Sequence, residues 1–290
     1  MDRTYIWVCI ILLLICVALV LFYNSGSLLR EYKNEAKRAL EKIYGADNTI
    51  LTLEDIQDLP KPVQNYIKYV GAIGKEKVHS FSVLAKGEMK MSNNSDWTPL
   101  DIEQYNFLDT QLIRLCYMKL KVYGLPIYAL HSYTDKKANM HIKLAGLITV
   151  ADAKGQEMRI SDSITLLNDI CLFAPAALID DRISWEEIDD TTVKAIFNTA
   201  YCTVSATLYF NERGELINFI SEDRYELKND GSFRKAKWST PFRDYKELDG
   251  MKVASYCEAI WNFPEGDYGY CRFTDIKKIN YNCSNQDYRQ

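Results

Sequence analysis

The sequence predicts an α+β, mainly β fold in which a transmembrane helix and a stalk helix precede a large curved, half-barrel-like antiparallel sheet with a short helical lid. Three observations predict it. A stretch of nineteen residues, 5–23, contains no charged residue and no proline. From Ser80 onward the apolar residues recur mostly with the period of two that is typical of strands. Turn-forming residues then occur at intervals too short for helical crossovers, which favours antiparallel pairing.

Residues 1–27 are predicted to form a single-pass membrane anchor. At the rise of an α-helix, the uncharged stretch spans roughly the 30 Å of a bilayer's hydrocarbon core. Tyr5, Trp7 and Tyr23 lie near its ends, where amphipathic rings prefer the membrane interface. A cleaved signal peptide is the alternative, although no small-x-small cleavage signal follows Phe22.

The charges beside this stretch bear on the side of the membrane that holds the rest of the chain. Four Lys or Arg residues follow within positions 30–38 and only Arg3 precedes, which by the positive-inside rule favours a cytoplasmic domain. Three Glu residues alternate with those cations, however, and a short tail before one span is the usual layout of a signal anchor that exports the domain after it. We expect an extracytoplasmic domain, and the cytoplasmic alternative stays open.

Residues 28–58 are predicted to form a stalk helix and a linker. From Leu28 to Tyr44 the apolar residues recur at helical spacing, with Lys, Arg and Glu between them, and Gly45 ends the pattern. Thr52 and Asp55, three residues apart, resemble a capping box that opens a short second helix.

Residues 59–283 are predicted to form the antiparallel β domain, with a tail after it at 284–290. The domain opens with a helix from Pro62 to Val70, because Pro is favourable in a first helical turn and Gly71 stops the run. Strands come next, one at 81–91 and the clearest at 202–210, where one face is apolar and the other is rich in hydroxyl groups.

Turn signals separate the strands, at 211–214, 229–231, 249–250 and 264–267. A helical insertion near 162–179 interrupts them, with Ser161 and Asp162 as candidate caps and Pro175 as its end. This lid and the helices before Gly71 offer less apolar surface than a one-sided sheet must cover. We therefore expect a cavity or groove between sheet and lid, the usual geometry of a site for a small apolar ligand.

Composition excludes several function classes. A net charge of −4 and a pI near 5.6 argue against a nucleic-acid-binding protein, which needs a basic face. We predict no cofactor, no metal site and no catalytic residue, because no phosphate-binding loop, nucleophile elbow or zinc-ligand spacing occurs, and His79, His131 and His141 lack a companion ligand. Six cysteines lie outside the anchor, and we expect packed, reduced thiols with disulfides as the alternative: Cys116, Cys171, Cys202, Cys257, Cys271 and Cys283.

Several motifs lie between Leu59 and Tyr281: Leu59-Pro60-Lys61-Pro62-Val63-Gln64-Asn65-Tyr66, Trp97-Thr98-Pro99 with Gln104-Tyr105, Leu144-Ala145-Gly146-Leu147, Phe173-Ala174-Pro175-Ala176-Ala177-Leu178, Trp185 with Ile188-Asp189-Asp190, Glu222-Asp223-Arg224-Tyr225, Trp238 with Phe242-Arg243-Asp244-Tyr245, and Asp249-Gly250. Together they resemble an uncharacterised bacterial family of membrane-associated proteins that has no established activity. More distantly, the strand-rich domain with a helical lid resembles the half-barrels of bacterial lipoprotein carriers and sensors, which hold acyl chains against a concave sheet; this is a fold-level analogy.

Seven residues are candidates for contact with a ligand. Tryptophans can line an apolar groove and leave an indole N–H to orient a polar ligand end, although core packing explains them equally. A lone arginine among acids can bind a head group or carboxylate through its guanidinium, with local ion pairing as the alternative. The candidates are Trp97, Tyr105, Phe173, Trp185, Arg224, Trp238 and Trp261.

The sequence thus predicts a membrane-anchored, non-enzymatic domain that binds an apolar or amphipathic ligand, such as a lipid or a lipoprotein acyl chain. One alternative is an envelope-associated enzyme that acts through carboxylates of the acidic cluster at 180–190, with Glu186, Asp189 and Asp190 as candidates. The other is a scaffold or sensor whose sheet edge or stalk helix meets a protein partner, whose identity the sequence does not indicate.

Overall fold

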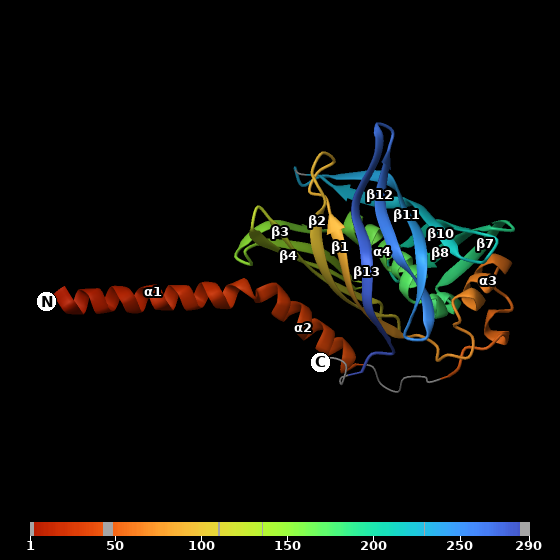
Figure 1. Ribbon diagram of the computed structural model, residues 1–290, viewed down its shortest axis with the longest axis horizontal. Coiled ribbons are helices and arrows are strands. Elements are labelled where there is room, and N and C mark those ends of the chain that lie inside the picture. Colours follow the sequence, from red (N-terminus) through yellow and green to blue (C-terminus); the bar gives the residue numbers. More distant parts are fainter. Residues whose placement is uncertain (1–2, 43–48, 110, 135, 229, 285–290) are drawn as a thin grey trace.

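The computed structural model describes residues 3–42, 49–109, 111–134, 136–228 and 230–284, so the predicted tail lies outside it after Ser284. A long N-terminal helix projects from a body that is built on one sheet (Figure 1). This helix, α1 (Arg3–Ser25), is long and apolar enough to cross a membrane, either as an anchor or as a signal sequence. Its described side chains from Tyr5 to Asn24 are exposed.

The sheet confirms the predicted antiparallel architecture. Within the described residues it has thirteen strands in the order β6-β5-β4-β3-β2-β1-β13-β12-β11-β10-β9-β8-β7, and every pairing is antiparallel. The strands are β1 (Ser80–Met89), β2 (Thr98–Phe107), β3 (Ile113–Val122), β4 (Leu125–Thr134), β5 (Lys137–Leu144), β6 (Ile148–Lys154), β7 (Ile183–Asp189), β8 (Thr192–Asn198), β9 (Thr203–Phe210), β10 (Leu216–Leu227), β11 (Phe233–Leu248), β12 (Met251–Phe263) and β13 (Gly266–Tyr281).

The chain builds this sheet in two runs. The first run proceeds strand by strand from β1 to the edge strand β6, and the second from the opposite edge strand β7 back to β13. Pairing of β1 with β13 joins the runs, with Phe81 opposite Tyr281 and Met89 opposite Cys271. The segment that connects the two edges, helix α4 (Gln156–Phe173) and the 3-10 helix η2 (Pro175–Ile179), therefore crosses a face of the sheet (Figure 1).

Helix α4 begins six residues earlier than the sequence pattern predicts. Its N-cap is Gly155, and Ser161 and Asp162 lie in the second turn instead of capping the helix. Ser161 instead links α4 to the sheet, because its hydroxyl accepts a hydrogen bond of 2.8 Å from the backbone N–H of Tyr225 on β10. The predicted end is confirmed, because the helix stops at Phe173 before Pro175.

The curved sheet surrounds the second half of α4. From Ser161 to Phe173 every residue except Thr165 is buried, whichever side of the helix it lies on. Helix α3 (Lys61–Tyr69) covers its C-terminal end, where Tyr66 donates a hydrogen bond of 2.7 Å to the carbonyl of Cys171. Polar residues such as Ser163 and Asp169 are thus enclosed together with aliphatic ones, which a two-sided helical pattern would not indicate.

Helix α2 (Ser27–Leu40) packs on the opposite face of the sheet. Leu28, Tyr32 and Ala36 are buried against Leu115 and Tyr117 of β3 and against a leucine of β4. Strand β3 is consequently buried on both faces. The predicted stalk helix is therefore a packed part of the body.

The short helices follow the sequence prediction closely. Thr52 and Asp55 form the reciprocal capping box at η1 (Glu54–Ile56): the Thr52 N–H donates to Asp55 Oδ2 over 2.7 Å, and the Asp55 N–H donates to Thr52 Oγ1 over 3.4 Å. Helix α3 ends at Tyr69 with Val70 as its C-cap, and Gly71 supplies the positive φ of 76° that terminates it.

Candidate functional site

A cavity of about 720 Å³ opens between the concave face of the sheet and the N-terminal half of α4. Strands β3, β4 and β5 form one wall, and β10, β12 and β13 form the other, with Met158 of α4 between them. The β1–β2 loop and the turn that joins β12 to β13 complete the rim. The predicted hollow between sheet and lid is thus present.

Flexible and apolar side chains dominate the first wall. The inward positions of three successive strands supply it, because alternate residues of a strand share a face. Five of the chain's seven methionines line the cavity, and such unbranched, polarisable side chains adapt to ligands of varied shape. Those methionines are Met89, Met91, Met118, Met140 and Met158.

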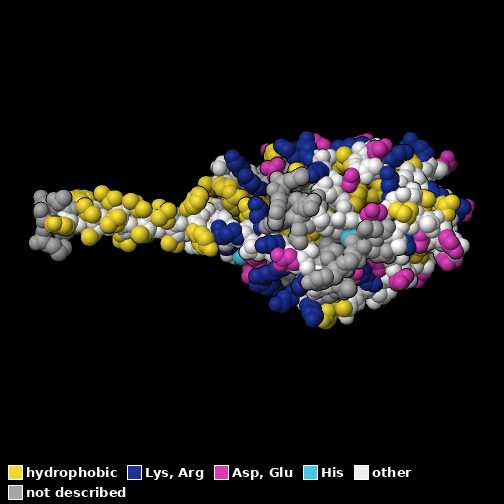
Figure 2. Space-filling view, turned by 90° about the horizontal axis from the view of Figure 1, so that it is seen from below, with side chains coloured by type: hydrophobic (Ala, Val, Ile, Leu, Met, Phe, Trp, Pro, Cys, Tyr) yellow, Lys and Arg dark blue, Asp and Glu magenta, His cyan; other side chains and the backbone are white. Residues whose placement is uncertain are grey.

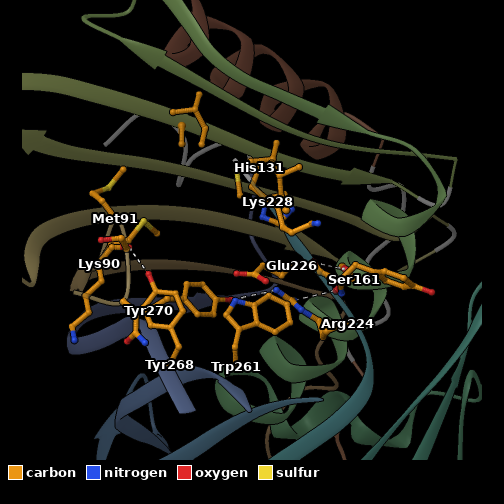
Figure 3. Close-up of a pocket in the computed structure, with 18 of the residues that line it drawn as sticks. Lys90, Met91, His131, Ser161, Arg224, Glu226, Lys228, Trp261, Tyr268 and Tyr270 are labelled. Carbon is orange, nitrogen blue, oxygen red and sulfur yellow. Dashed lines mark hydrogen bonds between the residues drawn. The ribbon is translucent and has the colours of Figure 1, made fainter. Parts of the chain in front are cut away.

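The second wall is aromatic. Trp261 stacks on Tyr270 with ring centroids 5.7 Å apart, and Tyr268 adjoins Tyr270 at 6.2 Å. Figure 3 shows these rings together, with the Arg224 side chain beside the indole. The Tyr268 hydroxyl donates a hydrogen bond of 3.3 Å to the carbonyl of Lys90, which holds the rim to the wall.

Two ionisable residues face each other in the cavity lining. His131 Nε2 of β4 lies 2.5 Å from Asp162 Oδ1 of α4, an ion pair when the imidazole is protonated. Asp162 is only 1% exposed; the imidazole of His131 lies against its Oδ1, and its Oδ2 has no hydrogen-bond partner within the described part of the chain. A buried carboxylate oxygen without a donor is costly, so Oδ2 is suited to accept a hydrogen bond from a bound ligand.

Behind this pair lies a second set of buried charges. Arg114 Nη1 is 3.3 Å from His131 Nδ1, and Arg114 Nε donates to Asp169 Oδ2 over 2.6 Å. Gln104 donates to the same Asp169 oxygen over 2.7 Å. Burial alone would lower the pKa of Arg114, but the neighbouring groups, with the charge of Asp169 foremost, together outweigh it and raise the pKa, so the guanidinium stays charged.

Arg224 provides a further charge of the lining, and it is the most enclosed of its cations. Its guanidinium donates to the Ser161 carbonyl over 3.1 Å, to the Thr165 hydroxyl and to the Tyr270 hydroxyl over 3.3 Å. It also lies 4.3 Å from the ring centre of Trp238, a cation–π contact. Arg224 is 8% exposed and forms no ion pair within the described residues, so the alternative of local ion pairing with its acidic neighbours does not hold.

The structure brings three of the seven sequence-predicted residues to this place. Arg224 and Trp261 line the cavity, and Trp238 lies directly behind Arg224. Their proximity arises because β10, β11 and β12 are neighbours in the sheet.

The other four predicted residues lie elsewhere. Trp97 packs outside the cavity beneath the guanidinium of Arg272, 4.1 Å from its ring centre. Tyr105 contacts Tyr32 of α2 on the opposite face of the sheet. Phe173 is fully buried at the far end of α4, and Trp185 is half-buried on the edge strand β7.

The sequence interpretation misses His131, Asp162 and the methionines of the cavity lining. The local pattern favours a helix cap for Asp162 and an isolated strand histidine for His131. Alternation on the strands carries a signal, since Met118, His131 and Met140 occupy inward positions of adjacent strands. That signal becomes readable only once the strand order is known.

The acidic cluster at 180–190 does not converge into a cleft. Glu186 is exposed and pairs with Lys194 over 3.1 Å, while Asp189 accepts hydrogen bonds from the N–H and hydroxyl of Thr191. Those bonds, with that from the backbone of Thr191 the strongest, lower the pKa of Asp189. Within the described residues no group of three or more His, Cys, Asp or Glu is placed to hold a metal ion.

Comparison with known proteins gives a family and several similar folds. Residues 49–273 match the profile of a family described as "Family of unknown function (DUF6544)". No curated protein matches the chain.

The solved structures that match are similar in fold alone, with sequence identities near 10%. A putative outer membrane lipoprotein-sorting protein domain from Vibrio parahaemolyticus is 10% identical over 72% of this chain and 88% of its own, with a TM-score of 0.40. A DUF1329 family protein from Desulfovibrio piger is 9% identical over 76% and 92%, with a TM-score of 0.42. A LolA superfamily protein from Nitrosomonas europaea is 10% identical over 78% and 96%, with a TM-score of 0.39.

Proposed function

We propose that this chain, which belongs to the DUF6544 family of unknown function, is a membrane-anchored, non-enzymatic domain that binds an amphipathic ligand such as a lipid or an acyl chain. The observation that carries the proposal is the cavity of about 720 Å³ with methionine, aliphatic and aromatic walls. Its volume falls within the ~300–1,000 Å³ typical of small-molecule sites.

The walls favour a flexible apolar group as the occupant. Leu120, Ile127 and Ile142 offer no hydrogen-bonding side chain, so affinity there comes from removing apolar surface from water. Each buried methylene of a ligand contributes about 0.8 kcal/mol before the costs of binding are subtracted. Methionines accommodate chains of different length, because their side chains change rotamer at low cost.

The charged groups of the lining favour a polar end on the same ligand. Asp162 and His131 lie on one side of the cavity, and Arg224 lies close to Ser161 at the start of the buried part of α4. A hydroxyl or amine donor would supply the hydrogen bond that Asp162 Oδ2 lacks. A purely hydrocarbon ligand would leave that oxygen without a partner.

The N-terminal helix supports a membrane location. All its described side chains from Tyr5 to Asn24 are exposed to the surroundings of the protein, an arrangement that is stable in lipid and unfavourable in water. In this proposal residues 1–27 anchor the chain and the β domain, on the extracytoplasmic side, takes its ligand close to the bilayer.

Photo-crosslinking tests the proposal. The full chain in lipid nanodiscs is irradiated with a fatty acid that carries a diazirine near the end of its chain, and modified peptides are located by tandem mass spectrometry. We expect modification of Met118, Met140 and Met158. In the variant Ala129→Trp an indole occupies part of the cavity, and this labelling should fall about tenfold or more, because the loss of a few buried methylenes accounts for that change in affinity.

Ser184→Trp is the matched control, since Ser184 is exposed on β7 and lies outside the cavity lining. Its labelling should equal that of the wild type. Crosslinks confined to α1, or equal labelling of Ala129→Trp and wild type, would contradict the proposal.

A further inference from the structure

Two turns of the sheet carry exposed apolar side chains that nothing in the cavity explains. The first joins β3 to β4, with Tyr123 in the turn and Leu125 at the start of β4; the second joins β5 to β6 and leads into Ile148 and Val150. Tyr123 is fully exposed, and Ile148 and Val150 are 64% and 61% exposed. With Leu147, these five residues are here called the tip residues.

The second turn is held directly against the end of α1. Gly146 approaches the Ser25 backbone so closely that a Cβ atom on it would lie 2.0 Å from the Ser25 carbonyl oxygen. Lys143 of β5 donates a hydrogen bond of 2.8 Å to the Ser27 hydroxyl at the start of α2. The turn and the helix junction are thus fixed to each other.

This contact sets the height of the tip residues relative to a bilayer. Ser25 follows Tyr23, the last aromatic residue of the uncharged stretch, by only two positions, which is about 3 Å along a helix axis. If α1 spans the membrane, Ser25 lies where hydrocarbon gives way to head groups, a region that adds ~5–8 Å on each side. A turn packed on Ser25 therefore lies at that level too.

The two segments that carry the tip residues contain charges of one sign. The segments 119–128 and 142–150 contain three lysines and no acidic residue. Lys119 and Lys121 are exposed on the face that α2 also covers. Figure 2 shows Lys and Arg side chains gathered at the end of the body that adjoins α1. Such cations attract anionic lipid head groups at short range.

We propose that the tip residues insert into the head-group region of the bilayer beside α1 and fix the orientation of the domain on the membrane. The occupant of this surface is lipid, because the anchor places the turns at the interface and the flanking lysines complement anionic head groups. The proposal rests on α1 as a membrane anchor and is independent of what fills the cavity.

Docking would also orient the cavity. Strands β3, β4 and β5, which lead into the two turns, form its first wall, and Leu120 and Ile127 of that wall flank the β3–β4 turn. Insertion of the tips brings this wall next to the membrane surface. A lipid would then need to cross little water to reach the cavity.

Quenching by lipid tests the docking. Full-length Ile148→Trp and Ile188→Trp are placed in nanodiscs of phosphatidylcholine and phosphatidylglycerol, with and without brominated acyl chains, and the emission of wild type is subtracted. Both isoleucines are exposed, at 64% and 56%, but Ile188 lies on β7 at the opposite edge of the sheet. We expect the emission added by Ile148→Trp to be quenched several-fold more than the emission added by Ile188→Trp.

Tyr123→Trp gives an independent measurement, because Tyr123 is fully exposed on the other turn and the change preserves an aromatic ring. Its added emission should be quenched like that of Ile148→Trp. Equal, weak quenching of all three variants would overturn the docking. Because the wild-type chain can still be labelled by the photoactivatable fatty acid in that case, the two proposals fail separately.

Discussion

Replacing Asp169 by alanine should be among the most destabilising changes in the β domain. Asp169 accepts a hydrogen bond of 2.6 Å from Arg114 Nε and one of 2.7 Å from Gln104. The side chains of Arg114 and Asp169 are 7% and 6% exposed. Asp169→Ala therefore leaves a guanidinium charge enclosed between α4 and the sheet without its counter-ion.

The magnitude depends on this burial. Breaking a buried ion pair by removing one partner costs about 3–5 kcal/mol, because the remaining charge cannot regain its hydration. For a domain of this size each kcal/mol corresponds to roughly 2–4 °C in Tm, so the expected decrease is roughly 6–20 °C. Near-ultraviolet circular dichroism of the full chain in nanodiscs, recorded during heating, measures it.

An exposed ion pair of similar length provides the control. Lys154 Nζ lies 2.8 Å from Asp152 Oδ2, and these side chains are 60% and 39% exposed. Asp152→Ala should cost at most about 1 kcal/mol, because water solvates the separated charges. The double variant Arg114→Met/Asp169→Leu should recover much of the loss, since apolar residues replace a buried pair at little cost. Equal Tm values for Asp169→Ala and Asp152→Ala would refute this reasoning.

Three further changes test other parts of the structure. Gly146→Ala should destabilise the chain and speed proteolysis at the α1–α2 junction, because the new Cβ would clash with Ser25. Gly124→Ala is the control: Gly124 also has a positive φ but nothing within 4 Å of the added Cβ, so the change should cost only about 1–2 kcal/mol of backbone strain. Equal effects of the two changes would contradict the close contact. Hydrogen bonds from Lys77 and then Thr52 lower the pKa of Asp55 to about 2. The stability that the ionised Asp55 contributes is therefore present above its ordinary pKa and is lost as the pH falls through about 2. In urea titrations between about pH 4 and 2, wild type should lose more stability than Asp55→Asn. Burial raises the pKa of Cys116 to about 11, so iodoacetamide at pH 8 should modify it about 100-fold more slowly in the folded chain than in the urea-unfolded chain, as measured by mass spectrometry.

The structure supports the alternative functions to different degrees. An enzyme built on Glu186, Asp189 and Asp190 requires carboxylates that converge, and these side chains lie exposed along β7 and its turn. A lipid-binding domain requires an unfilled apolar space, and such a space lies between α4 and the sheet. The sequence predicts that space because its strands have more apolar surface than its helices can cover. It also places the space on the face of the sheet that the helical lid covers.

The site itself is predicted only in part. Chemistry alone singles out Arg224 and Trp261, and both line the cavity. Trp97 and Tyr105 have the same chemistry and lie elsewhere, because residue type alone does not say which face of which strand meets the lid. His131 and Asp162 escape prediction, since their pairing joins β4 to a helix that begins six residues before its predicted start.

The sequence by itself determined the local structure. An uncharged stretch specifies a membrane-length helix, alternation specifies strands, and turn residues such as Gly214 and Gly250 at positive φ close the hairpins between them. Each of these signals acts over a few residues, and antiparallel neighbours result from short connections.

Only the tertiary structure decided how the two runs of strands meet. The pairing of β1 with β13 joins residues about 190 positions apart, and α4 crosses between the edges to lie within the curve of the sheet. Burial of apolar surface drives this assembly, but the local sequence does not specify which strands pair, because the hydrophobic effect is non-directional. The volume left beside α4, and the side chains that surround it, are therefore properties of the assembled fold.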